Sequence, residues 1–285
     1  MIKYFELIRV KQWYKNVVVF IPLVFAGKFL DLKALILTLI GFFALCLVSS
    51  SNYIINDLKD IEKDRRHPEK KFRPIASGKV KKWEAIIICS ALLAASIFIS
   101  VKLSISFFLC VVAIFVLTQG YTFYLRNEQF LDIIMIAINF VIRAVSGAFI
   151  INVRISPWLI LCTFFLSLFL SAGKREADIR LLKDKAVFHK RVLKDYNIQI
   201  TNALMIISTS ALILSYALYS FLSIYPMLIY TIPFALYAIF RYLYLVYSGS
   251  EIGRHPEKAI LDKRLLIGSF LWLISIFFII LYSVT

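Results

Sequence analysis

The sequence contains few of the side chains that most often act as acids, bases, nucleophiles or soft metal ligands. Only three of its 285 residues are histidines, and only four are cysteines. The histidines fall in polar connections, and none has a sequence neighbour that would orient its ring as a base. The cysteines lie inside apolar segments without the spacing of a metal site, which indicates small buried hydrophobic side chains. These residues are His67, His189, His255, Cys46, Cys89, Cys110 and Cys162.

Features of a soluble or secreted protein are also missing. No soluble domain, linker or low-complexity tract stands out. No cleavable signal peptide is apparent, because residues 1–16 carry four bases and no short apolar core that ends in small residues. The chain is instead 61% hydrophobic with 25 phenylalanines, and its mean hydropathy is +0.82. Roughly half of the residues of a soluble protein are apolar, so this composition excludes an ordinary soluble globule.

The apolar residues form runs long enough to cross a hydrocarbon layer of about 30 Å. We therefore predict an all-α polytopic membrane protein, built as a single membrane-embedded domain over residues 1–285. The first run is short, and we expect it to be tilted or half-inserted. The nine predicted helices are 15–28, 33–56, 82–101, 103–124, 130–150, 155–176, 198–219, 224–246 and 265–284.

Negative charge is scarce, because 17 acids face 33 bases and the formal net charge is +16. Twenty-seven of the 33 bases lie in the N-terminus and in alternate connections between the predicted helices, and only four lie in the other connections. The positive-inside rule then predicts a multi-pass plasma-membrane protein whose N-terminus and basic connections are cytoplasmic. Topology alone accounts for basic loops, so we expect no nucleic-acid partner. The basic connections are 57–82, 125–131, 174–194 and 249–264.

Amide and carboxylate side chains follow one face of the second predicted helix and of its continuation toward His67-Pro68. A proline disfavours helix in the residue before it, so we expect the helix to end near Arg66. At about 100° per residue, five polar side chains fall within an arc of about 140°, while Glu62 points away. The five are Asn52, Asn56, Asp57, Asp60 and Asp64.

Three carboxylates on one stripe repel one another, and a hard divalent cation relieves that repulsion. Mg²⁺ prefers oxygen ligands and is usually held by one or two carboxylates plus substrate phosphates. We therefore predict that Asp57, Asp60 and Asp64 bind Mg²⁺. The alternative is a solvated helix end whose acids pair with neighbouring bases. The stripe continues into the membrane at Asn52 and Asn56, which a solvated end does not need.

The bases that follow the stripe suit the same ligand. Lys70, Lys71 and Arg73 lie in a connection punctuated by prolines and a glycine. Lysine and arginine bind phosphate, and arginine does so with two-pronged geometry. The alternative for each base is a connection that is basic only because it is cytoplasmic.

These motifs resemble those of a known family. The chain carries N-D-x-x-D-x-x-x-D-R at 56–65 and H-P-x-K-x-x-R-P-I-A-S-G at 67–78. Together they resemble the first aspartate-rich motif of the UbiA-type intramembrane prenyltransferase superfamily, for which they are strongly specific. The resemblance implies nine transmembrane helices around a central cavity that opens to the cytoplasmic side.

Within that superfamily the sequence is most similar to the decaprenyl-phosphate phosphoribosyltransferase branch, whose substrates are 5-phosphoribose-1-diphosphate and polyprenyl phosphate. The resemblance covers nearly the whole chain in the right order, although the later motifs are only moderately specific. The matching motifs are R-x-K-Q-W-x-K-N at 9–16, F-V-I-R-A-V-S-G at 140–147, S-P-W at 156–158, A-G-K-R-x-x-D at 172–178 and a P-E pair followed by D-x-R within 256–264.

Prenyltransferases of the superfamily usually carry a second aspartate-rich motif, D-x-x-x-D, at the end of the sixth helix. This chain has Asp178 and Asp184 there, and bases such as Lys174 and Arg175 crowd them. A cavity with one acidic and one basic wall suits phosphoribosyl pyrophosphate, which offers a diphosphate to metal and a separate 5-phosphate to bases. The alternative for Lys174 and Arg175 is anchoring of a helix end at the membrane surface.

The other candidate residues also have structural alternatives. Asp262 suits either contact with ribose hydroxyls or metal, or stabilisation of a helix N-terminus. Arg143 lies well inside a predicted helix, where a charge usually faces a polar cavity or a partner. It suits either phosphate binding or contact with helix-end carbonyls. The remaining predicted substrate-binding residues are Asn52, Lys70, Arg73, Asp178, Arg264, Arg9 and Lys11.

The sequence therefore predicts an enzyme that transfers 5-phosphoribosyl from phosphoribosyl pyrophosphate to a decaprenyl-like polyprenyl phosphate, a cell-wall precursor reaction that releases pyrophosphate. Asp57, Asp60, Asp64 and Asn56 are its predicted catalytic residues. One rival is a prenyltransferase with an aromatic or glyceryl-phosphate acceptor, and the other is a non-enzymatic membrane transporter. Broken or charged helices through both halves of the membrane would favour the transporter. Membrane lipids are expected partners, and homo-oligomerisation stays open.

Overall fold

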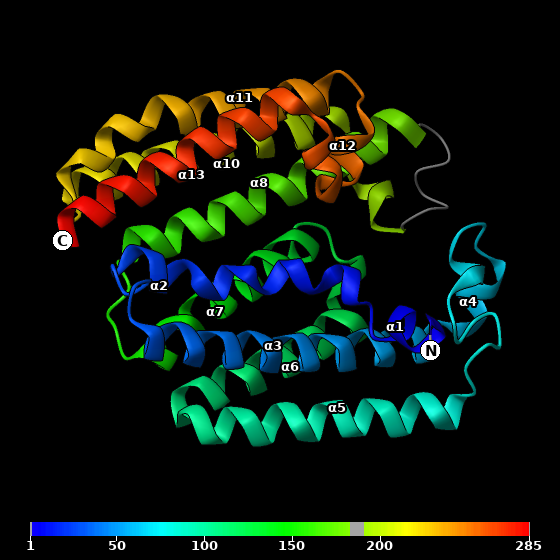
Figure 1. The fold of residues 1–285 in the computed structure, drawn as a ribbon. Helices are drawn as coiled ribbons and strands as arrows, with labels where there is room; N and C mark the ends of the chain where they lie inside the picture. Colours follow the sequence, from blue (N-terminus) through cyan, green and yellow to red (C-terminus); the bar gives the residue numbers. More distant parts are fainter. Residues whose placement is uncertain (1, 183–190, 285) are drawn as a thin grey trace. The chain divides into compact units, whose positions relative to one another are not determined.

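The computed structural model describes residues 2–182 and 191–284, and within these ranges it contains helices and no strand. Eight apolar helical stretches in the described residues are long enough to cross a membrane. They confirm the prediction of an all-α polytopic membrane protein (Figure 1). The helices are α3 (Leu32–Lys59), α5 (Lys82–Leu103), α6 (Ile105–Phe123), α7 (Leu131–Ile151), α8 (Pro157–Leu182), α10 (Ile198–Leu222), α11 (Ile232–Tyr247, extended at its start by the 3-10 helix Pro226–Thr231) and α13 (Lys263–Val284).

The first predicted span, 15–28, takes a different form. It is built from an 11-residue 3-10 helix, η1 (Val10–Phe20), and a five-residue α-helix, α2 (Ile21–Phe25). Pro22 lies in the first turn of α2, where its missing N–H costs no helical hydrogen bond. The described part of the chain therefore contains eight helices long enough to cross a membrane, and this composite segment takes the place of the first of the nine predicted helices.

Two compact units make up the chain, and α7 contributes to both. The first unit contains the residues up to Phe123 together with Ile142–Arg154. Its core packs η1, α3, α6 and the second half of α7 through side chains such as Leu45 and Phe107. Gly147 permits this packing, because a Cβ atom there would collide with the carbonyl oxygen of Val19.

A second hydrophobic cluster in the first unit holds the polar end of α3 in place. It joins α1 (Ile2–Leu7), α3, α4 (Ile61–Arg66), α5 and the connection between α4 and α5. Figure 1 shows α1 and α4 near the C-terminal end of α3. The cluster fixes the backbone that carries the aspartate-rich motif, and its buried members are Leu7, Ile54, Ile61, Ile75, Val80, Ala85 and Cys89.

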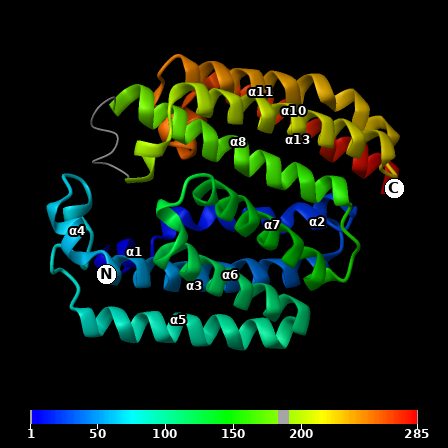
Figure 2. The same ribbon diagram turned by 180° about the vertical axis from the view of Figure 1, so that it is seen from behind.

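The second unit contains Tyr124–Val141 and the residues from Ile155 onward. In this unit α8 packs most extensively against α10, and α11 runs beside α13 (Figure 2). The short helix α12 (Glu251–Arg254) contacts α8, where a Cβ atom on Gly253 would lie 2.8 Å from the Cβ atom of Ala177. This close approach brings the chain before α13 against the C-terminal part of α8.

The predicted orientation can be tested within the first unit. Ser77 and Asn152 are both exposed, and they lie in connections that the distribution of bases assigns to opposite sides of the membrane. We expect a cysteine at Ser77 to react with a membrane-impermeant maleimide only from the cytoplasmic side, and a cysteine at Asn152 only from the other side. The unsubstituted protein gives the background, because Cys46, Cys89 and Cys162 are buried and Cys110 is half-buried. Reversed labelling would show that the orientation is wrong.

Candidate functional site

The aspartate-rich motif lies where α3 ends and α4 begins. Asp60 separates the two helices, with φ −96° and ψ 13°, so the stripe is not carried by one uninterrupted helix. The helical direction continues across the break, because Asp60 N–H donates to the Asn56 carbonyl at 3.0 Å and Asp64 N–H donates to the Asp60 carbonyl at 2.7 Å. The predicted end is confirmed: α4 stops at Arg66, and His67 has an extended ψ of 135° before Pro68.

Two of the predicted metal-binding carboxylates meet in the structure. Asp57 and Asp64 are 3% and 2% exposed, and one guanidinium nitrogen, Arg73 Nη1, lies 2.9 Å from Asp57 Oδ1 and 2.7 Å from Asp64 Oδ2. Arg9 reaches the same Asp57 oxygen through Nη2 at 2.5 Å. Arg9 has a left-handed backbone (φ 51°) at the start of η1. Asp57 therefore binds one arginine from the N-terminal motif and one from the connection after α4.

The connection that follows supplies partly buried bases beside these carboxylates. Burial, and then the positive charge of Arg73, lowers the pKa of the half-buried Lys70 ammonium. Burial, followed by the charge of Lys70, also lowers the pKa of His67. Its Nδ1 accepts backbone N–H groups from Glu69 and Lys70 at 3.2 Å and 3.3 Å. His67 is thus a neutral turn residue at pH 7, while a bound anion would raise the pKa of Lys70 again.

The amide end of the stripe contacts α6. Asn52 is 3% exposed, and its Oδ1 accepts a hydrogen bond from Gln119 Nε2 at 2.5 Å. Two turns further along α3, Lys59 Nζ donates to the carbonyl of Thr122 at 2.8 Å and lies 3.9 Å from the centre of the Phe123 ring. The sequence reasoning did not single out Gln119 or Thr122. The available signal was a glutamine inside an otherwise largely apolar helix.

These residues suit a hard cation. Among the residues that the structure describes, no three His, Cys, Asp or Glu side chains are grouped closely enough to form a metal site. Asp57 and Asp64 nevertheless converge on a single cationic nitrogen, and their oxygens belong to the ligand class that Mg²⁺ prefers. Asp60 and Asn56 are half-buried beside them. The donor set therefore fits Mg²⁺ held by two carboxylates and substrate oxygens, and a ligand role for Asp60 stays a prediction.

In the second unit, Arg175 forms a buried ion pair. It is 4% exposed, and its Nε and Nη2 lie 2.9 Å and 2.8 Å from Oδ2 of Asp132, which has no exposed surface. Tyr196 O–H donates to the other carboxylate oxygen of Asp132 at 2.7 Å. Asp132, at the start of α7, thereby joins Arg175 of α8 to Tyr196, two residues before α10. Asp132 is the centre of this contact.

The neighbouring charges of α8 have separate partners. Asp178, 2% exposed, accepts a hydrogen bond from Arg254 Nε of α12 at 2.9 Å. Glu176 is fully buried and is bonded to both Arg180 and Thr201. Lys174 is exposed. Arg175 and Asp178 therefore contact different partners, and Asp184 lies outside the described residues.

Of the remaining predicted residues, Asp262 has partners within the protein, whereas Arg264 and Lys11 are exposed. Asp262 accepts the Leu265 N–H at 2.7 Å at the start of α13, and Arg241 holds it through two nitrogens at 3.1 Å and 2.7 Å. The hydrogen bond from Arg241 is the largest cause that lowers the pKa of Asp262. These contacts correspond to the helix-start alternative.

Arg143 has a partner from the N-terminal motif. Its Nε donates to Asn16 Oδ1 at 2.9 Å, and Asn16 is 1% exposed. Ser49 of α3 donates to the same amide oxygen at 3.4 Å. Arg143 is therefore held in the first unit through η1 and α3.

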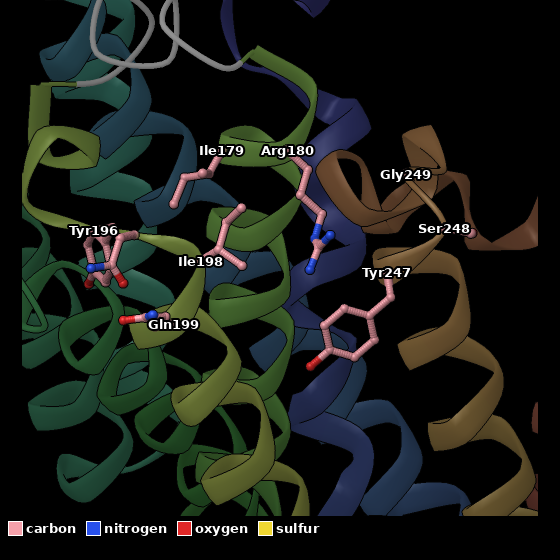
Figure 3. Close-up of a pocket in the computed structure, with 9 residues that line it drawn as sticks. Ile179, Arg180, Tyr196, Ile198, Gln199, Tyr247, Ser248 and Gly249 are labelled. Atoms are coloured by element: carbon pink, nitrogen blue, oxygen red, sulfur yellow. The ribbon is translucent and has the colours of Figure 1, made fainter.

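The second unit also contains an open pocket of about 940 Å³ between the ends of α8, α10 and α11 (Figure 3). Among the described residues that line it, Arg180 alone is charged, and Figure 3 shows Arg180 and Tyr247 close together at its edge. The guanidinium carbon of Arg180 lies 5.5 Å from the centre of the Tyr247 ring, and the Glu176 carboxylate forms an ion pair with Arg180. None of the described lining residues is an acid, so the described part of the lining lacks the carboxylates that a metal–diphosphate site needs.

Comparison with known proteins places these features in a family. The model of the UbiA prenyltransferase family matches residues 17–258. A decaprenyl-phosphate phosphoribosyltransferase from Mycolicibacterium smegmatis is 33% identical over 281 residues, covering 91% of this chain and 86% of that protein. One from Corynebacterium glutamicum is 32% identical over 280 residues, covering 94% and 84%. The structure of a UbiA homologue from Archaeoglobus fulgidus bound to GPP and Mg²⁺ has a TM-score of 0.73 and 19% identity, and covers 98% of this chain and 99% of that one.

Proposed function

The chain belongs to the UbiA prenyltransferase family and is a membrane transferase, and we propose that it transfers 5-phosphoribosyl from phosphoribosyl pyrophosphate to a polyprenyl phosphate. The observation that carries this proposal is the likeness, over nine-tenths of the chain, to relatives named decaprenyl-phosphate phosphoribosyltransferase. In the reaction, the bond between the anomeric carbon and a pyrophosphate oxygen breaks. A bond between that carbon and an oxygen of the lipid phosphate forms, and pyrophosphate leaves.

The polar end of α3 has the chemistry to hold the leaving group. Mg²⁺, when bound by Asp57, Asp64 and Asp60 with Asn56 nearby, supplies positive charge that stabilises the departing pyrophosphate. Arg73 and Arg9 already lie against Asp57, so each can exchange a carboxylate contact for a phosphate oxygen without a large movement. The same anion would stabilise the charged form of Lys70, because a phosphate next to the ammonium opposes the lowering of its pKa by burial.

The acceptor needs little activation. A lipid phosphate is anionic near pH 7, so no strong general base is required. His67 is neutral and is used within its own turn, and His255 lies 3.2 Å from Glu257 at a partly exposed position. His189 lies outside the described residues. The proposed chemistry therefore rests on charge and positioning by Asp, Asn, Arg and Lys side chains.

A prenyl donor is the second candidate. The observation that favours it is the fold shared with a UbiA homologue whose structure contains GPP and Mg²⁺. Both donors present a diphosphate, so the first aspartate-rich motif would serve either one. They differ beyond the diphosphate, where one is a phosphorylated sugar and the other is a hydrocarbon.

A donor screen with purified protein separates the two candidates. We expect pyrophosphate release from phosphoribosyl pyrophosphate that depends on both Mg²⁺ and a polyprenyl phosphate, with phosphoribosyl-labelled lipid as the product. Geranylgeranyl diphosphate with an aromatic or glyceryl-phosphate acceptor should give no product. Turnover of the prenyl donor alone would overturn the phosphoribosyl assignment and leave the family assignment intact.

Lys174 provides a sharper test of the sugar phosphate. It is an exposed base of the A-G-K-R-x-x-D motif, to which the sequence assigns binding of the 5-phosphate. We expect Lys174→Ala to weaken phosphoribosyl pyrophosphate binding about thirtyfold, or about 2 kcal/mol, and to leave inorganic pyrophosphate binding within twofold. Calorimetry on folded protein measures both. Lys194→Ala, an exposed lysine of the same unit, is the matched control. Equal weakening of both ligands would contradict a role for Lys174 in binding the 5-phosphate.

A further inference from the structure

Three buried polar atoms gather between α3 and α6, close to the aspartate-rich motif. In the part of the chain that the structure describes, Asn52 Nδ2, Gln119 Oε1 and Thr122 Oγ1 have no hydrogen-bond partner. Asn52 and Thr122 are 3% and 1% exposed. A buried polar group without a partner is destabilising, and natural proteins leave few of them. Three such atoms in one place indicate a ligand that completes their hydrogen bonds.

The set contains both a donor and an acceptor whichever way the amides are turned. As placed, Gln119 Nε2 donates to Asn52 Oδ1, which leaves an N–H₂ group of Asn52 and an oxygen of Gln119. Turning both amides over exchanges the atoms but again leaves one donor and one acceptor. Thr122 Oγ1 both donates and accepts. A pair of neighbouring hydroxyl groups on a ligand has the same double capacity and would satisfy all three atoms.

The position of the cluster along α3 agrees with such a ligand. Asn52 precedes Asp57 by five residues, about 7.5 Å along the helix axis at 1.5 Å per residue. At helical spacing, the half-buried Asn56 and Asp60 lie between the amide side of the stripe and its carboxylate side. If the diphosphate of the donor binds at the carboxylates, the group attached to it would lie beside Asn52 and its neighbours on α6. The distance to be covered is about the size of one sugar ring.

Resting on the phosphoribosyl function proposed above, we infer that Gln119 and Thr122, with Asn52, bind the ribose hydroxyl groups of the donor and determine its specificity. A prenyl diphosphate places hydrocarbon at this point and would leave all three polar atoms unpaired. Sites built to hydrogen-bond a hydroxyl reject analogues that lack it far more strongly than apolar pockets reject an added group. Asn52, Gln119 and Thr122 thus determine donor specificity beside the metal-binding stripe.

The test compares three ligands and matched variants. Gln119→Leu removes both the unpaired acceptor and the donor to Asn52 Oδ1 at a similar side-chain size, and Thr122→Val removes the hydroxyl. Cys110→Ala, a half-buried position elsewhere on α6, is the control. The ligands are phosphoribosyl pyrophosphate, its 2-deoxy or 3-deoxy analogue, and inorganic pyrophosphate. Binding is measured by calorimetry with Mg²⁺ and without lipid acceptor, on protein whose thermal unfolding is normal.

We expect the wild type to bind phosphoribosyl pyrophosphate about tenfold more tightly than one of the deoxy analogues, as one buried hydrogen bond predicts. In Gln119→Leu or Thr122→Val this ratio should fall to near one, while pyrophosphate binding stays within twofold of the wild type. An unchanged ratio in both folded variants would overturn the inference and leave the phosphoribosyl function standing. A wild type that fails to bind phosphoribosyl pyrophosphate and binds a prenyl diphosphate would instead overturn the proposed function.

Discussion

Asp60→Asn is expected to lower turnover by at least about a thousandfold while the protein stays folded. Asp60 lies between Asp57 and Asp64, where the two helices of the motif meet, and it is half-buried rather than locked in the core. Replacing it with an amide keeps the shape but removes a negative charge that the metal–pyrophosphate complex needs. Loss of stabilisation of a leaving group by one charged ligand typically costs several kcal/mol of activation free energy. Initial rates at saturating Mg²⁺ measure the effect.

Glu62→Gln is the matched control for Asp60→Asn. Glu62 is two residues away, carries the same charge and is bonded only to exposed Arg65 at 3.1 Å. We expect its activity to stay within twofold of the wild type. A folded Asp60→Asn protein with activity within a few-fold of wild type would show that Asp60 is not part of the metal site. The substitution should also impair binding of phosphoribosyl pyrophosphate and of pyrophosphate alike, because both present a diphosphate.

Arg175→Met is expected to destabilise the protein by about 3–5 kcal/mol, because it leaves Asp132 as a buried charge without its guanidinium. Methionine fills a similar volume, so the loss reports mainly on charge. The midpoint of thermal unfolding in detergent should fall by roughly 6–10 °C or more. Adding Asp132→Asn to Arg175→Met should recover part of the loss, because the buried carboxylate is then neutral.

Arg65→Met is the comparison for Arg175→Met. The pair of Arg65 with Glu62 is exposed on both sides, and such pairs contribute about 0–1 kcal/mol. If Arg175→Met unfolds at the wild-type temperature but loses phosphoribosyl pyrophosphate binding, Arg175 binds substrate as the sequence motif predicts. If it unfolds early, Arg175 instead supports the helix end from which Lys174 projects.

Much of the fold follows from local patterns. Runs of apolar residues identify eight long helices, because a chain in hydrocarbon must satisfy its backbone hydrogen bonds internally. Proline stereochemistry fixes the end of α4 at Arg66. The break at Asp60 has no comparable signal: no proline or glycine marks it, and the motif reads as one continuous helix in sequence. The first predicted span was also expected as one short helix and is instead η1 followed by α2.

The candidate site shows where sequence reasoning stops. Helical spacing predicts that Asp57 and Asp64 share a face, since 3.6 residues complete a turn. It cannot give their partners, because Arg9 is 48 residues from Asp57 and Gln119 is 67 residues from Asn52. The sequence also puts Lys174 and Asp178 in one motif, but Asp178 accepts a hydrogen bond from Arg254, 76 residues further along the chain.

The sequence by itself determined the membrane architecture, the family and the identity of the carboxylates and bases at the polar end of α3, because these depend on composition, periodicity and short motifs. Only the tertiary structure decided which charges are available to a substrate. Burial makes an unpaired charge costly, so each buried side chain takes whatever partner the packing brings near. Arg175 is thereby bound to Asp132, whereas one polar side-chain atom in each of Asn52, Gln119 and Thr122 stays unpaired.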